Sequence, residues 1–360
     1  MTNRLGIGIV GCGQAVQTLH IPAFRHLPDK LFIAALHDAS PSVTIRLAET
    51  IPGATPYASF EALLNDPAVD AVLVASPSAL HATHALQAMR AGKHVLIEKP
   101  MCFTLEEASE LQSAEQESGC IALVGYMRRH AGAFKEAVAL IEPLRGEINF
   151  ARVRDIVGQS PAFLSSITAV IRGDDVPDAE KERLDAISSA ALKAAIGTDE
   201  NTMAGIYNML LGLSSHDISA MRELIGRPQR VLSALYRRGG RFISAVFDYG
   251  DFVCHFETGF DQIARFDVNL EVFTPQRQVR VDYDTTFIRH QPARLTVTEA
   301  NTPTGVSTRS SYQSRQDSFI IEWEYFHDCV VMGRRPKTDI KDARQDIELF
   351  AEMMKLMAAQ

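Results

Sequence analysis

The chain has 360 residues, of which 46% are apolar and 22% are charged, as is usual for a folded globular protein. One hydrophobic core rarely serves a chain of this length, so we expect two domains. Lys and Arg total 36 against 44 Asp and Glu, and the net charge of -8 argues against nucleic acid or an acidic membrane as a partner. Five scattered cysteines without a CxxC pair predict reduced thiols in a cytoplasmic protein. No apolar window is long enough to span a membrane.

The first 125 residues alternate between strand-like and helix-like segments. Short apolar runs, typical of strands buried on both faces, are separated by the segments 60–66 and 80–92, which have apolar residues at helical spacing. This order predicts an α/β domain over residues 1–125, built on a doubly wound parallel sheet. The predicted strands are LGIGIV (5–10), FIAALHD (32–38), AVLVAS (71–76), HVLIEK (94–99) and CIALVGY (120–126).

After about residue 145 the pattern changes to that of an antiparallel sheet. The run 266–273 alternates between apolar and polar residues, and the alternation continues in 278–283. We therefore assign residues 126–335 to a second, α+β domain. A face of alternating apolar residues is unlikely to be left in water, so we expect a homodimer or homotetramer. The apolar residues of this face include Val268, Leu270 and Val272.

Three further segments complete the predicted layout. A helical insert over about 160–201 contains a helix that begins after Pro177 and ends at Gly197. The insert is a lid, a subunit contact or a mere helical decoration. The Ser/Thr-rich segment 302–318 is predicted as a loop, and 336–360 as a C-terminal helix that packs back on the second domain. The apolar stripe of the insert consists of Leu184, Ile187, Ala191, Leu192, Ala195 and Ile196.

A strand that runs into Gly11-Cys12-Gly13 and then into a helix is typical of a dinucleotide phosphate loop. Backbone N–H groups approach a pyrophosphate there because glycine has no Cβ, and the helix N-terminus favours an anion. Val16 stands at the third glycine position of the motif, so the pattern by itself is incomplete. Asp38 ends the second predicted strand, where a carboxylate binds both ribose hydroxyls of NAD and repels the extra phosphate of NADP. The alternative for Asp38 is a cap on the turn before Ser40-Pro41.

The stretch LIEKPMCFTLEEA (96–108) resembles the EKP motif of the glucose-fructose oxidoreductase / inositol dehydrogenase (Gfo/Idh/MocA) family. The resemblance extends over most of the chain. It implies a Rossmann domain and hydride transfer between NAD(P) and a secondary alcohol of a sugar or cyclitol. It also implies that residues 126–335 form a substrate-binding and oligomerisation domain with a large open antiparallel sheet. Other stretches agree with the family in the same order: VGCGQAVQTLHIPAF (10–24), ASPSALHATHALQAMRAGKHV (75–95), GYMRRH (125–130) and YFHDCVVMGRRPKTDIKDA (325–343).

The resemblance also implies a set of cofactor-binding residues. In chain order they match the phosphate loop, the acid on the ribose, the turn beside the nicotinamide ribose, and the pair beside the nicotinamide. These residues are Gly11, Gly13, Gln14 and Ala15, then Asp38, then Ser76, Pro77 and His81, and finally Glu98 and Lys99.

Lys99 is the residue whose chemistry the proposed reaction needs. Removal of a hydride from a carbinol carbon requires the hydroxyl proton to leave, so a group with a tuned pKa must lie near the nicotinamide. A lysine beside the positively charged oxidised ring would have its pKa lowered and would act more easily as a base. The alternative is a surface lysine before a proline, and the EKP context favours the functional role.

The second half of the family's catalytic set is incomplete in this chain. His216 matches the family histidine, but Gly212 stands at the position of the acid four residues before it, and Ser219 at that of a further acid. Ser215 is predicted to cap a helix that His216 opens, where the positive end of the helix would keep the imidazole neutral. For Asp217 there are three alternatives: it contacts the substrate, it offsets the effect of the helix end on His216, or it stabilises the start of the helix. The alternative for His216 is a capping or core histidine.

Arg128, Arg129 and His130 match the part of the family that borders the substrate. We expect Arg128 to contact the cofactor, and Arg129 and His130 to contact the substrate. The alternative is that one arginine is a solvated surface charge.

These observations predict an NAD(H)-dependent oxidoreductase, with NADP as the less favoured cofactor, that acts on a secondary hydroxyl or ketone of a sugar, cyclitol or glycoside. We expect no metal site. Because the acid at Gly212 is missing, a second possibility is a redox-neutral enzyme that keeps NAD bound and cleaves glycosides through transient oxidation. A third is a non-catalytic relative that senses a sugar or nucleotide, against which the presence of Lys99 and His216 argues.

Overall fold

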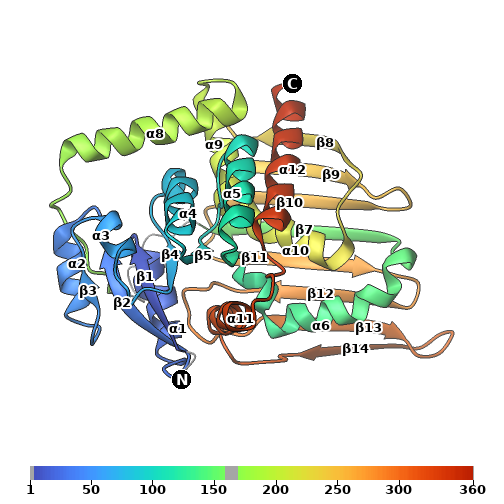
Figure 1. Cartoon of the computed structure of the whole chain (residues 1–360). Helices are drawn as coiled ribbons and strands as arrows, with labels where there is room; N and C mark the ends of the chain where they lie inside the picture. The colour runs from blue at the N-terminus through green and yellow to red at the C-terminus, as the bar shows by residue number, and fades with distance from the viewer. Residues whose placement is uncertain (1–3, 159–168, 360) are drawn as a thin grey trace. The chain divides into compact units, whose positions relative to one another are not determined.

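The computed structural model describes residues 4–158 and 169–359, and the chain divides into two compact units (Figure 1). Unit 1 consists of residues 1–125, 168–197 and 319–347, and unit 2 of residues 126–167, 198–318 and 348–360. The boundaries predicted from the sequence differ in that 168–197 and 319–347 pack with the first part of the chain. Asp175 and Trp323 account for this difference, because they form hydrogen bonds with Ser40 and His20 respectively. Residues 160–168 of the predicted insert lie outside the described residues.

Unit 1 is built on a six-stranded parallel sheet, which confirms the predicted doubly wound fold. The strand order is β3-β2-β1-β4-β5-β6, so the order reverses between β1 and β4. Ligands of such sheets bind at the carboxyl ends of the strands where the order reverses. The strands are β1 (Leu5–Val10), β2 (Leu31–His37), β3 (Thr55–Pro56), β4 (Ala71–Val74), β5 (His94–Ile97) and β6 (Ala122–Val124).

The helices of unit 1 begin and end at the signals that the sequence carries. The Ser40 side chain caps α2 by accepting from the backbone of Val43, and Thr104 forms a capping box with Glu107 at the start of α5. Gly92 follows α4 with a φ of 74°, the left-handed conformation that ends a helix. The segments are a π-helical stretch (Val16–His20), α1 (Ile21–Phe24), α2 (Pro41–Ala48), α3 (Phe60–Leu64), a 3₁₀ turn (Ser78–Leu80), α4 (His81–Arg90), α5 (Leu105–Ser118), α8 (Asp178–Ile196) and α11 (Ser318–Met332).

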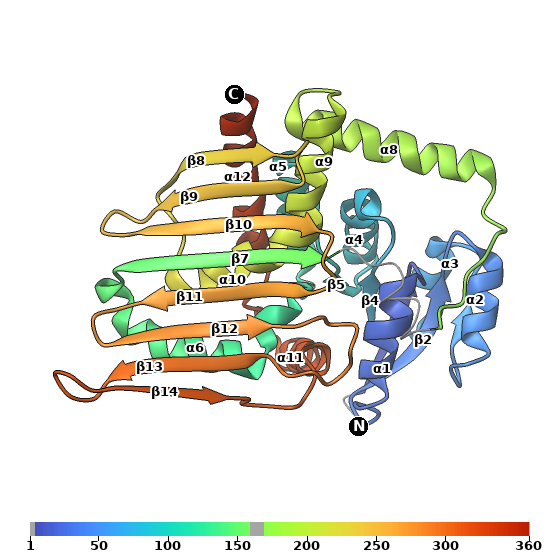
Figure 2. The same ribbon diagram turned by 180° about the vertical axis from the view of Figure 1, so that it is seen from behind.

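Unit 2 is built on an eight-stranded sheet with the order β14-β13-β12-β11-β7-β10-β9-β8 (Figure 2). Strands β7 and β10 pair in parallel and all the other neighbours pair antiparallel, so the predicted antiparallel sheet is confirmed with one exception. Gly250 has a φ of 88° in the turn between β9 and β10. The strands are β7 (Phe150–Gly158), β8 (Arg230–Arg237), β9 (Phe242–Asp248), β10 (Val253–Asp261), β11 (Phe266–Phe273), β12 (Arg277–Tyr283), β13 (Arg294–Ala300) and β14 (Val306–Ser311).

The helices of unit 2 include α6 and α10 on one face of this sheet, and Figure 2 shows the other face, across which no described helix of unit 2 runs. Val268, Leu270 and Val272 are only 1–2% exposed. These residues belong to the core under the helices, so the prediction that they form an oligomer contact is wrong. The helical segments are a 3₁₀ turn (Met127–His130), α6 (Gly132–Ile141), a 3₁₀ stretch (Glu142–Glu147), α9 (Asn201–Met209), a π-helical stretch (Leu210–Ser214) and α10 (Ser215–Ile225), with α12 (Ile340–Ala358) divided between the units.

The segment 302–318, which the sequence predicts as a loop, contains strand β14. The Ser310 hydroxyl of this strand lies 3.0 Å from that of Thr296 on β13, and the Thr308 hydroxyl lies 3.0 Å from that of Thr298. Cross-strand hydroxyl pairs therefore hold an exposed edge strand that lacks apolar alternation. The helix of the insert is confirmed as α8 and ends at Gly197, but none of its residues is fully buried, and its predicted apolar stripe is half-buried.

Candidate active site

Unit 1 contains a cavity of about 540 Å³ at the carboxyl ends of β1, β2 and β4. This is the place where the strand order reverses. The cavity is bounded on one side by the loops after these strands and on the other by α8 and the residues before it. Its lining includes Gly11, His37, Asp38, Pro41, Ser76, Pro77, Leu80 and His84 from the first part of the chain, and Val176, Pro177, Glu180, Arg183 and Leu184 from the insert.

Asp38 is fixed at the rim of this cavity by two backbone donors. Its Oδ2 accepts from the backbone N–H of Cys12 at 2.7 Å, and its Oδ1 accepts from that of Ser40 at 2.8 Å. Each carboxylate oxygen keeps capacity for a second hydrogen bond. The half-buried carboxylate thus links the glycine loop to the start of α2 and can still accept from two vicinal hydroxyls, which is how a ribose would be held.

The two glycines of the loop serve different purposes. Gly11 has a φ of 89°, and a Cβ on it would come within 2.4 Å of the carbonyl oxygen of Ala75 and 2.5 Å of the backbone nitrogen of Ser76. A Cβ on Gly13 would meet nothing within 4 Å. Gly11 is therefore required by the close approach of β1 and the loop after β4, whereas the open space at Gly13 fits a phosphate group. Gln14 begins the following helical segment, together with Ala15.

The loop after β4 is anchored by two histidines of α4. The ring nitrogens of His81 lie 2.7 Å from the carbonyl oxygens of Pro100 and Ser76, so this buried ring ties the loops after β4 and β5 together. Burial lowers the pKa of His81, although both carbonyl oxygens favour the protonated ring. His84 lies 2.8 Å from the Ser76 hydroxyl, and burial together with the charges of His81, His37 and Arg183 lowers its pKa to about 4.

His84 was not singled out from the sequence, although it stands three residues after His81 and shares its helix face. Arg183 and Glu180 of α8 also line the cavity without having been predicted. They are far from Asp38 along the chain, and no local pattern indicates that a helix of the insert borders the cavity.

Glu98, at the end of β5, is held by a chain of three side chains. The Trp323 indole N–H donates to Nδ1 of His20 at 3.0 Å, so Nε2 of His20 carries the proton and donates to Glu98 Oε1 at 2.9 Å. The other oxygen, Oε2, accepts from the Lys99 backbone N–H at 3.1 Å. Burial alone would raise the pKa of Glu98, but the hydrogen bond from His20 and the charge of Lys99 hold it below its ordinary value. Lys99 itself is half-buried beside this ionised carboxylate.

Unit 2 contains a buried cluster of one arginine and two carboxylates. Arg128 Nη1 lies 2.6 Å from Asp217 Oδ2 and 3.3 Å from Asp155 Oδ2, and the exposed fractions are 5% for Arg128 and 0% for both aspartates. Burial and the neighbouring Asp155 raise the pKa of Asp217 well above its ordinary range, against the opposing charge of Arg128. Asp155 was not predicted, because it is one polar residue in an alternating strand.

The remaining candidates next to Arg128 are also buried. Arg129 is 3% exposed and its Nε donates to Glu223 Oε2 at 2.5 Å, while His130 is 2% exposed. The alternative that one of the two arginines is a solvated surface charge is therefore wrong. Within unit 2, Asp217 binds Arg128 and Glu223 binds Arg129, and both carboxylates belong to α10. These partners lie 89 and 94 residues further along the chain, so no local sequence pattern indicates them.

His216 does not open a helix. The chain is helical from Asn201 through α9, a π-helical stretch and α10, and Ser215 makes no side-chain cap. The predicted effect of a positive helix end on the His216 imidazole therefore does not apply, and the same holds for a role of Asp217 at a helix start. Gly212 lies in the π-helical stretch, is exposed, and has open space where a Cβ would stand.

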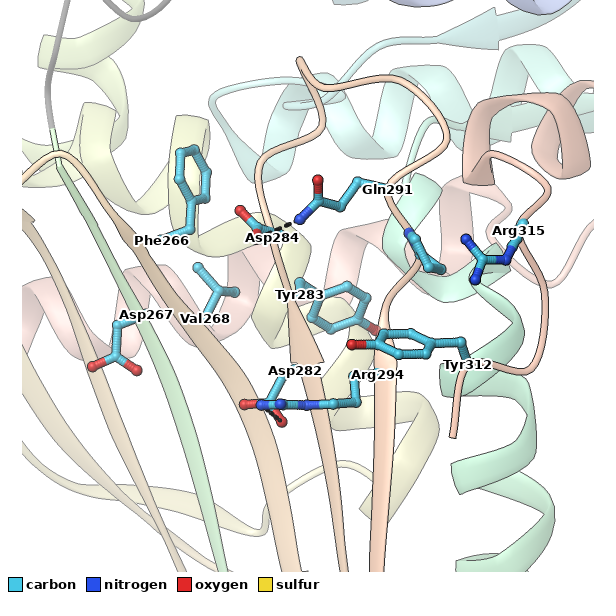
Figure 3. A pocket seen from close by; sticks show the side chains of 11 residues that line it. Phe266, Asp267, Val268, Asp282, Tyr283, Asp284, Gln291, Arg294, Tyr312 and Arg315 are labelled. Carbon is cyan, nitrogen blue, oxygen red and sulfur yellow. Dashed lines mark hydrogen bonds and ion pairs between the residues drawn. The ribbon is translucent and has the colours of Figure 1, made fainter. Parts of the chain in front are cut away.

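A second cavity, of about 500 Å³, lies within unit 2 (Figure 3). The Gln291 amide donates to Asp284 Oδ2 at 2.8 Å, and the Tyr283 hydroxyl donates to the carbonyl oxygen of Arg128 at 3.1 Å, which connects this cavity to the charge cluster. Its lining offers both hydrogen-bond donors and acceptors, as a ligand with several hydroxyl groups requires. The polar residues are Asp267, Asp282, Tyr283, Asp284, Gln291, Arg294, Tyr312 and Arg315.

Comparison with known proteins agrees with this geometry. Residues 5–126 match the model of the Gfo/Idh/MocA oxidoreductase family, described as an NAD-binding Rossmann fold. The matched residues make up about a third of the chain and lie in the first part of unit 1. The residues that match the family model include the glycine loop, Asp38 and the Glu98-Lys99 pair.

The proteins that the chain resembles include enzymes named for either nicotinamide cofactor. A scyllo-inositol 2-dehydrogenase (NADP(+)) of Bacillus subtilis (strain 168) is 35% identical over 139 residues, which are 39% of this chain and 38% of that protein. A scyllo-inositol 2-dehydrogenase (NAD(+)) of the same organism is 26% identical over 301 residues, 80% of this chain and 75% of that protein. The chain spans less than half the length of several curated relatives that it matches.

Solved structures share the fold over nearly the whole chain. A levoglucosan dehydrogenase in complex with NADH and levoglucosan superposes with a TM-score of 0.77, at 18% identity, and covers 99% of this chain and 98% of that chain. Among the helices that the structure describes, none has the length and apolar character needed to cross a membrane. In residues 4–158 and 169–359, no group of three or more His, Cys, Asp and Glu side chains is arranged to hold a metal ion.

Proposed function

We propose that this protein is an NAD(H)-dependent oxidoreductase that transfers a hydride between nicotinamide and a secondary hydroxyl or ketone of a sugar, cyclitol or glycoside. The observation that carries the proposal is the geometry of Asp38 at the cavity of unit 1. Its carboxylate is fixed by Cys12 and Ser40 and keeps acceptor capacity toward the cavity. The open space at Gly13 leaves room for a dinucleotide pyrophosphate at the glycine loop, next to this cavity's Gly11.

The preference for NAD over NADP is part of this proposal. A carboxylate on the ribose hydroxyls repels a 2′-phosphate, and we expect NADH to bind at least about tenfold more tightly than NADPH, or about 1.4 kcal/mol. Relatives with both cofactors are known, so the family resemblance does not decide the question. Fluorescence titration with both reduced cofactors tests it, and equal or tighter NADPH binding contradicts it.

Lys99 and His216 are the groups that we propose for proton transfer. The bound nicotinamide would accept or supply the hydride. Lys99 stands beside the ionised carboxylate of Glu98, which the Trp323-His20 chain orients, and would exchange a proton with the substrate oxygen. His216 is half-buried in the middle of a continuous helical stretch and would be the second group of this pair.

The substrate class rests on the chemistry of unit 2 and on the family. The cavity of unit 2 offers carboxylates, arginines and tyrosine hydroxyls, which suit a ligand with several hydroxyl groups. Relatives named as inositol dehydrogenases support a cyclitol or sugar. A second candidate function is redox-neutral cleavage of a glycoside with NAD kept bound, and the glycine at the family acid position, Gly212, favours it.

The test begins with the protein as purified. Mass analysis after denaturation would report any bound dinucleotide, and an absorbance screen for NADH over hexoses, inositols and glycosides would report net oxidation. NADH formation with a hexose or inositol supports the dehydrogenase. Release of an aglycone without NADH accumulation supports the second candidate. A protein that neither binds nor reduces a dinucleotide would overturn both.

A further inference from the structure

Residues 171–175, which we call the strap, lie against the start of α2 inside unit 1. The side-chain amide of Gln17 donates to the carbonyl oxygen of Ile171 at 3.0 Å and accepts from the Ile171 N–H at 2.8 Å. Arg46 Nη1 donates to the carbonyl oxygen of Arg172 at 3.2 Å. The backbone of the strap is thus held by side chains from the glycine-loop helix and from α2.

Asp175 ends the strap with its carboxylate on the first turn of α2. Oδ2 accepts from the backbone N–H of Ser42 at 2.8 Å, and Oδ1 accepts from the Ser42 hydroxyl at 2.9 Å and from the Ser40 hydroxyl. The hydrogen bonds from Ser40 and Ser42 lower the pKa of Asp175 to about 2, so the group is ionised at neutral pH. An anion at this place is stabilised by the free N–H groups and the dipole of α2.

The fit of the strap on Ser40 requires a glycine. A Cβ on Gly173 would lie 2.1 Å from the Ser40 hydroxyl oxygen and 2.7 Å from Oδ1 of Asp175. The Ser40 hydroxyl also accepts from the Val43 N–H at 3.2 Å as the cap of α2, so it cannot turn away without uncapping the helix. The contact is therefore specific to this sequence rather than a loose crossing of two loops.

The strap occupies the groups that a 2′-phosphate would use. Ser40 connects the two carboxylates, because its N–H donates to Asp38 and its hydroxyl to Asp175. A phosphate on the ribose at Asp38 needs hydroxyls, N–H groups or an arginine nearby. Ser40, Ser42 and Arg46 follow Asp38 in the chain and carry such groups, and all three already bind the strap.

We propose that Asp175 is a second determinant of cofactor selectivity, whose carboxylate fills the anion position at the start of α2 and rejects the 2′-phosphate of NADP(H). This inference rests on the proposed function, because it concerns the same dinucleotide cavity. The inference gives a role to the strap, which is part of the insert. The strap supplies a negative charge that selects NAD over NADP.

Titration of the full-length protein with NADH and with NADPH tests this role in wild type, Asp175→Asn and Asp174→Asn. Asp175→Asn keeps the size of the side chain and removes its charge. We expect it to tighten NADPH binding about tenfold, the scale of repulsion in water between a carboxylate and a doubly charged phosphate a few ångströms apart. NADH binding should stay within threefold. Asp174→Asn removes an exposed charge one residue away and should leave the ratio of the two affinities unchanged.

A second variant addresses the strap as a whole. Gly173→Ala should push the strap away from Ser40 and raise the affinity for NADPH relative to NADH in the same direction as Asp175→Asn. The inference is overturned if Asp175→Asn and Asp174→Asn give the same ratio within twofold, or if Asp175→Asn weakens both cofactors equally. In those cases wild type still binds NADH and the proposed function stands. A wild type that binds neither dinucleotide overturns the proposed function and this inference with it.

Discussion

Unit 1 and unit 2 place their charged side chains in different surroundings. In unit 1, Asp38 and Lys99 are half-buried and lie in loops at the ends of parallel strands. Backbone N–H groups hold the Asp38 carboxylate in place, and Lys99 lies next to Glu98. In unit 2, Arg128, Asp155 and Asp217 are at most 5% exposed and bind one another in the interior. Charges of the first kind remain accessible to a ligand, whereas charges of the second kind depend on their partners for solvation. Substitutions in unit 1 should therefore change binding or chemistry, and those in the buried cluster of unit 2 should change stability.

The largest effect is expected for Arg128→Ala. Removal of the only cation of the cluster leaves two buried carboxylates without compensation, so the free energy of unfolding should fall by about 3–5 kcal/mol. Urea unfolding measures this. The matched control is Arg154→Ala, which also removes an arginine bound to two carboxylates, Glu257 and Asp267, but one that is 31% exposed. That variant should lose less than about 1 kcal/mol.

A double variant separates charge from packing at the same site. Arg128→Ala combined with Asp217→Asn leaves a single buried carboxylate, so it should be more stable than Arg128→Ala alone. Equal losses for Arg128→Ala and Arg154→Ala would remove the distinction between the two kinds of site.

For unit 1 the corresponding test is Lys99→Ala. If Lys99 exchanges the substrate proton, kcat should fall by about 100-fold or more while NADH affinity and the melting temperature change little. Lys99→Arg keeps a positive charge but cannot act as a base near neutral pH, so it should lose as much activity. Steady-state kinetics with the substrate found in the screen measures both variants. A Lys99→Arg enzyme with near wild-type kcat would assign the residue to charge stabilisation.

His216→Ala tests the second proton-transfer group in the same way. We expect a loss in kcat of about 100-fold with NADH affinity unchanged within a few-fold. Near-full activity would make His216 a structural residue of the helix. If both Lys99→Ala and His216→Ala remain active, the proposed mechanism is wrong.

Glu115 on α5 is one of the buried carboxylates of unit 1, which depend on their surroundings as the charges of unit 2 do. Burial and the charge of Asp339 raise its pKa from 4.5 to about 7, against the charge of Arg335. The folded state holds the proton of Glu115 more tightly than the unfolded state does. The contribution of Glu115 to the free energy of unfolding is therefore greatest below pH 4.5 and falls as the pH rises to about 7. The loss from this residue is about 2–3 kcal/mol.

Glu115→Gln should therefore flatten the dependence of unfolding free energy on pH between pH 5 and pH 8. Denaturant titrations at several pH values measure it. Glu117→Gln on the exposed side of the same helix should keep the wild-type profile. Parallel profiles for wild type and Glu115→Gln would show that Arg335 neutralises the buried carboxylate.

The same contrast explains how far the sequence could be used to predict the molecule. The parallel sheet, the glycine loop and the position of Asp38 depend on residues close together in the chain, so local patterns predict them. The cluster around Arg128 joins residues from β7 and α10, and Asp155 has no local feature that separates it from other polar residues of an alternating strand. His216 is wrongly predicted to begin a helix, because a serine before it imitates a cap in the middle of a continuous helical stretch. The strap and α8 come to the cavity from far along the chain, which hydrophobic periodicity cannot indicate.

The smallest expected effect concerns Trp323, which acts on Glu98 through His20. Trp323→Phe removes the indole N–H but keeps an aromatic ring against Phe24, whose centroid lies 4.6 Å from that of the indole. Loss of one buried hydrogen bond should cost about 1 kcal/mol in unfolding free energy. With its Nδ1 no longer bound to a donor, His20 is free to adopt the other tautomer, in which Nε2 cannot donate to Glu98.

Nitrogen NMR of His20 distinguishes these tautomers and gives a readout that a purely structural role of Trp323 would not move. We expect wild type to hold its proton on Nε2 and Trp323→Phe to give a mixture of the two forms, with a loss of a few-fold in kcat and little change in KM. Phe24→Leu is the control, because it disturbs the packing around Trp323 without removing the indole donor, and should destabilise the protein while leaving the His20 tautomer fixed. If Trp323→Phe keeps the wild-type tautomer and kcat, Glu98 is oriented by the Lys99 backbone alone, and the buried side of unit 1 contributes to stability but not to the chemistry of the cavity.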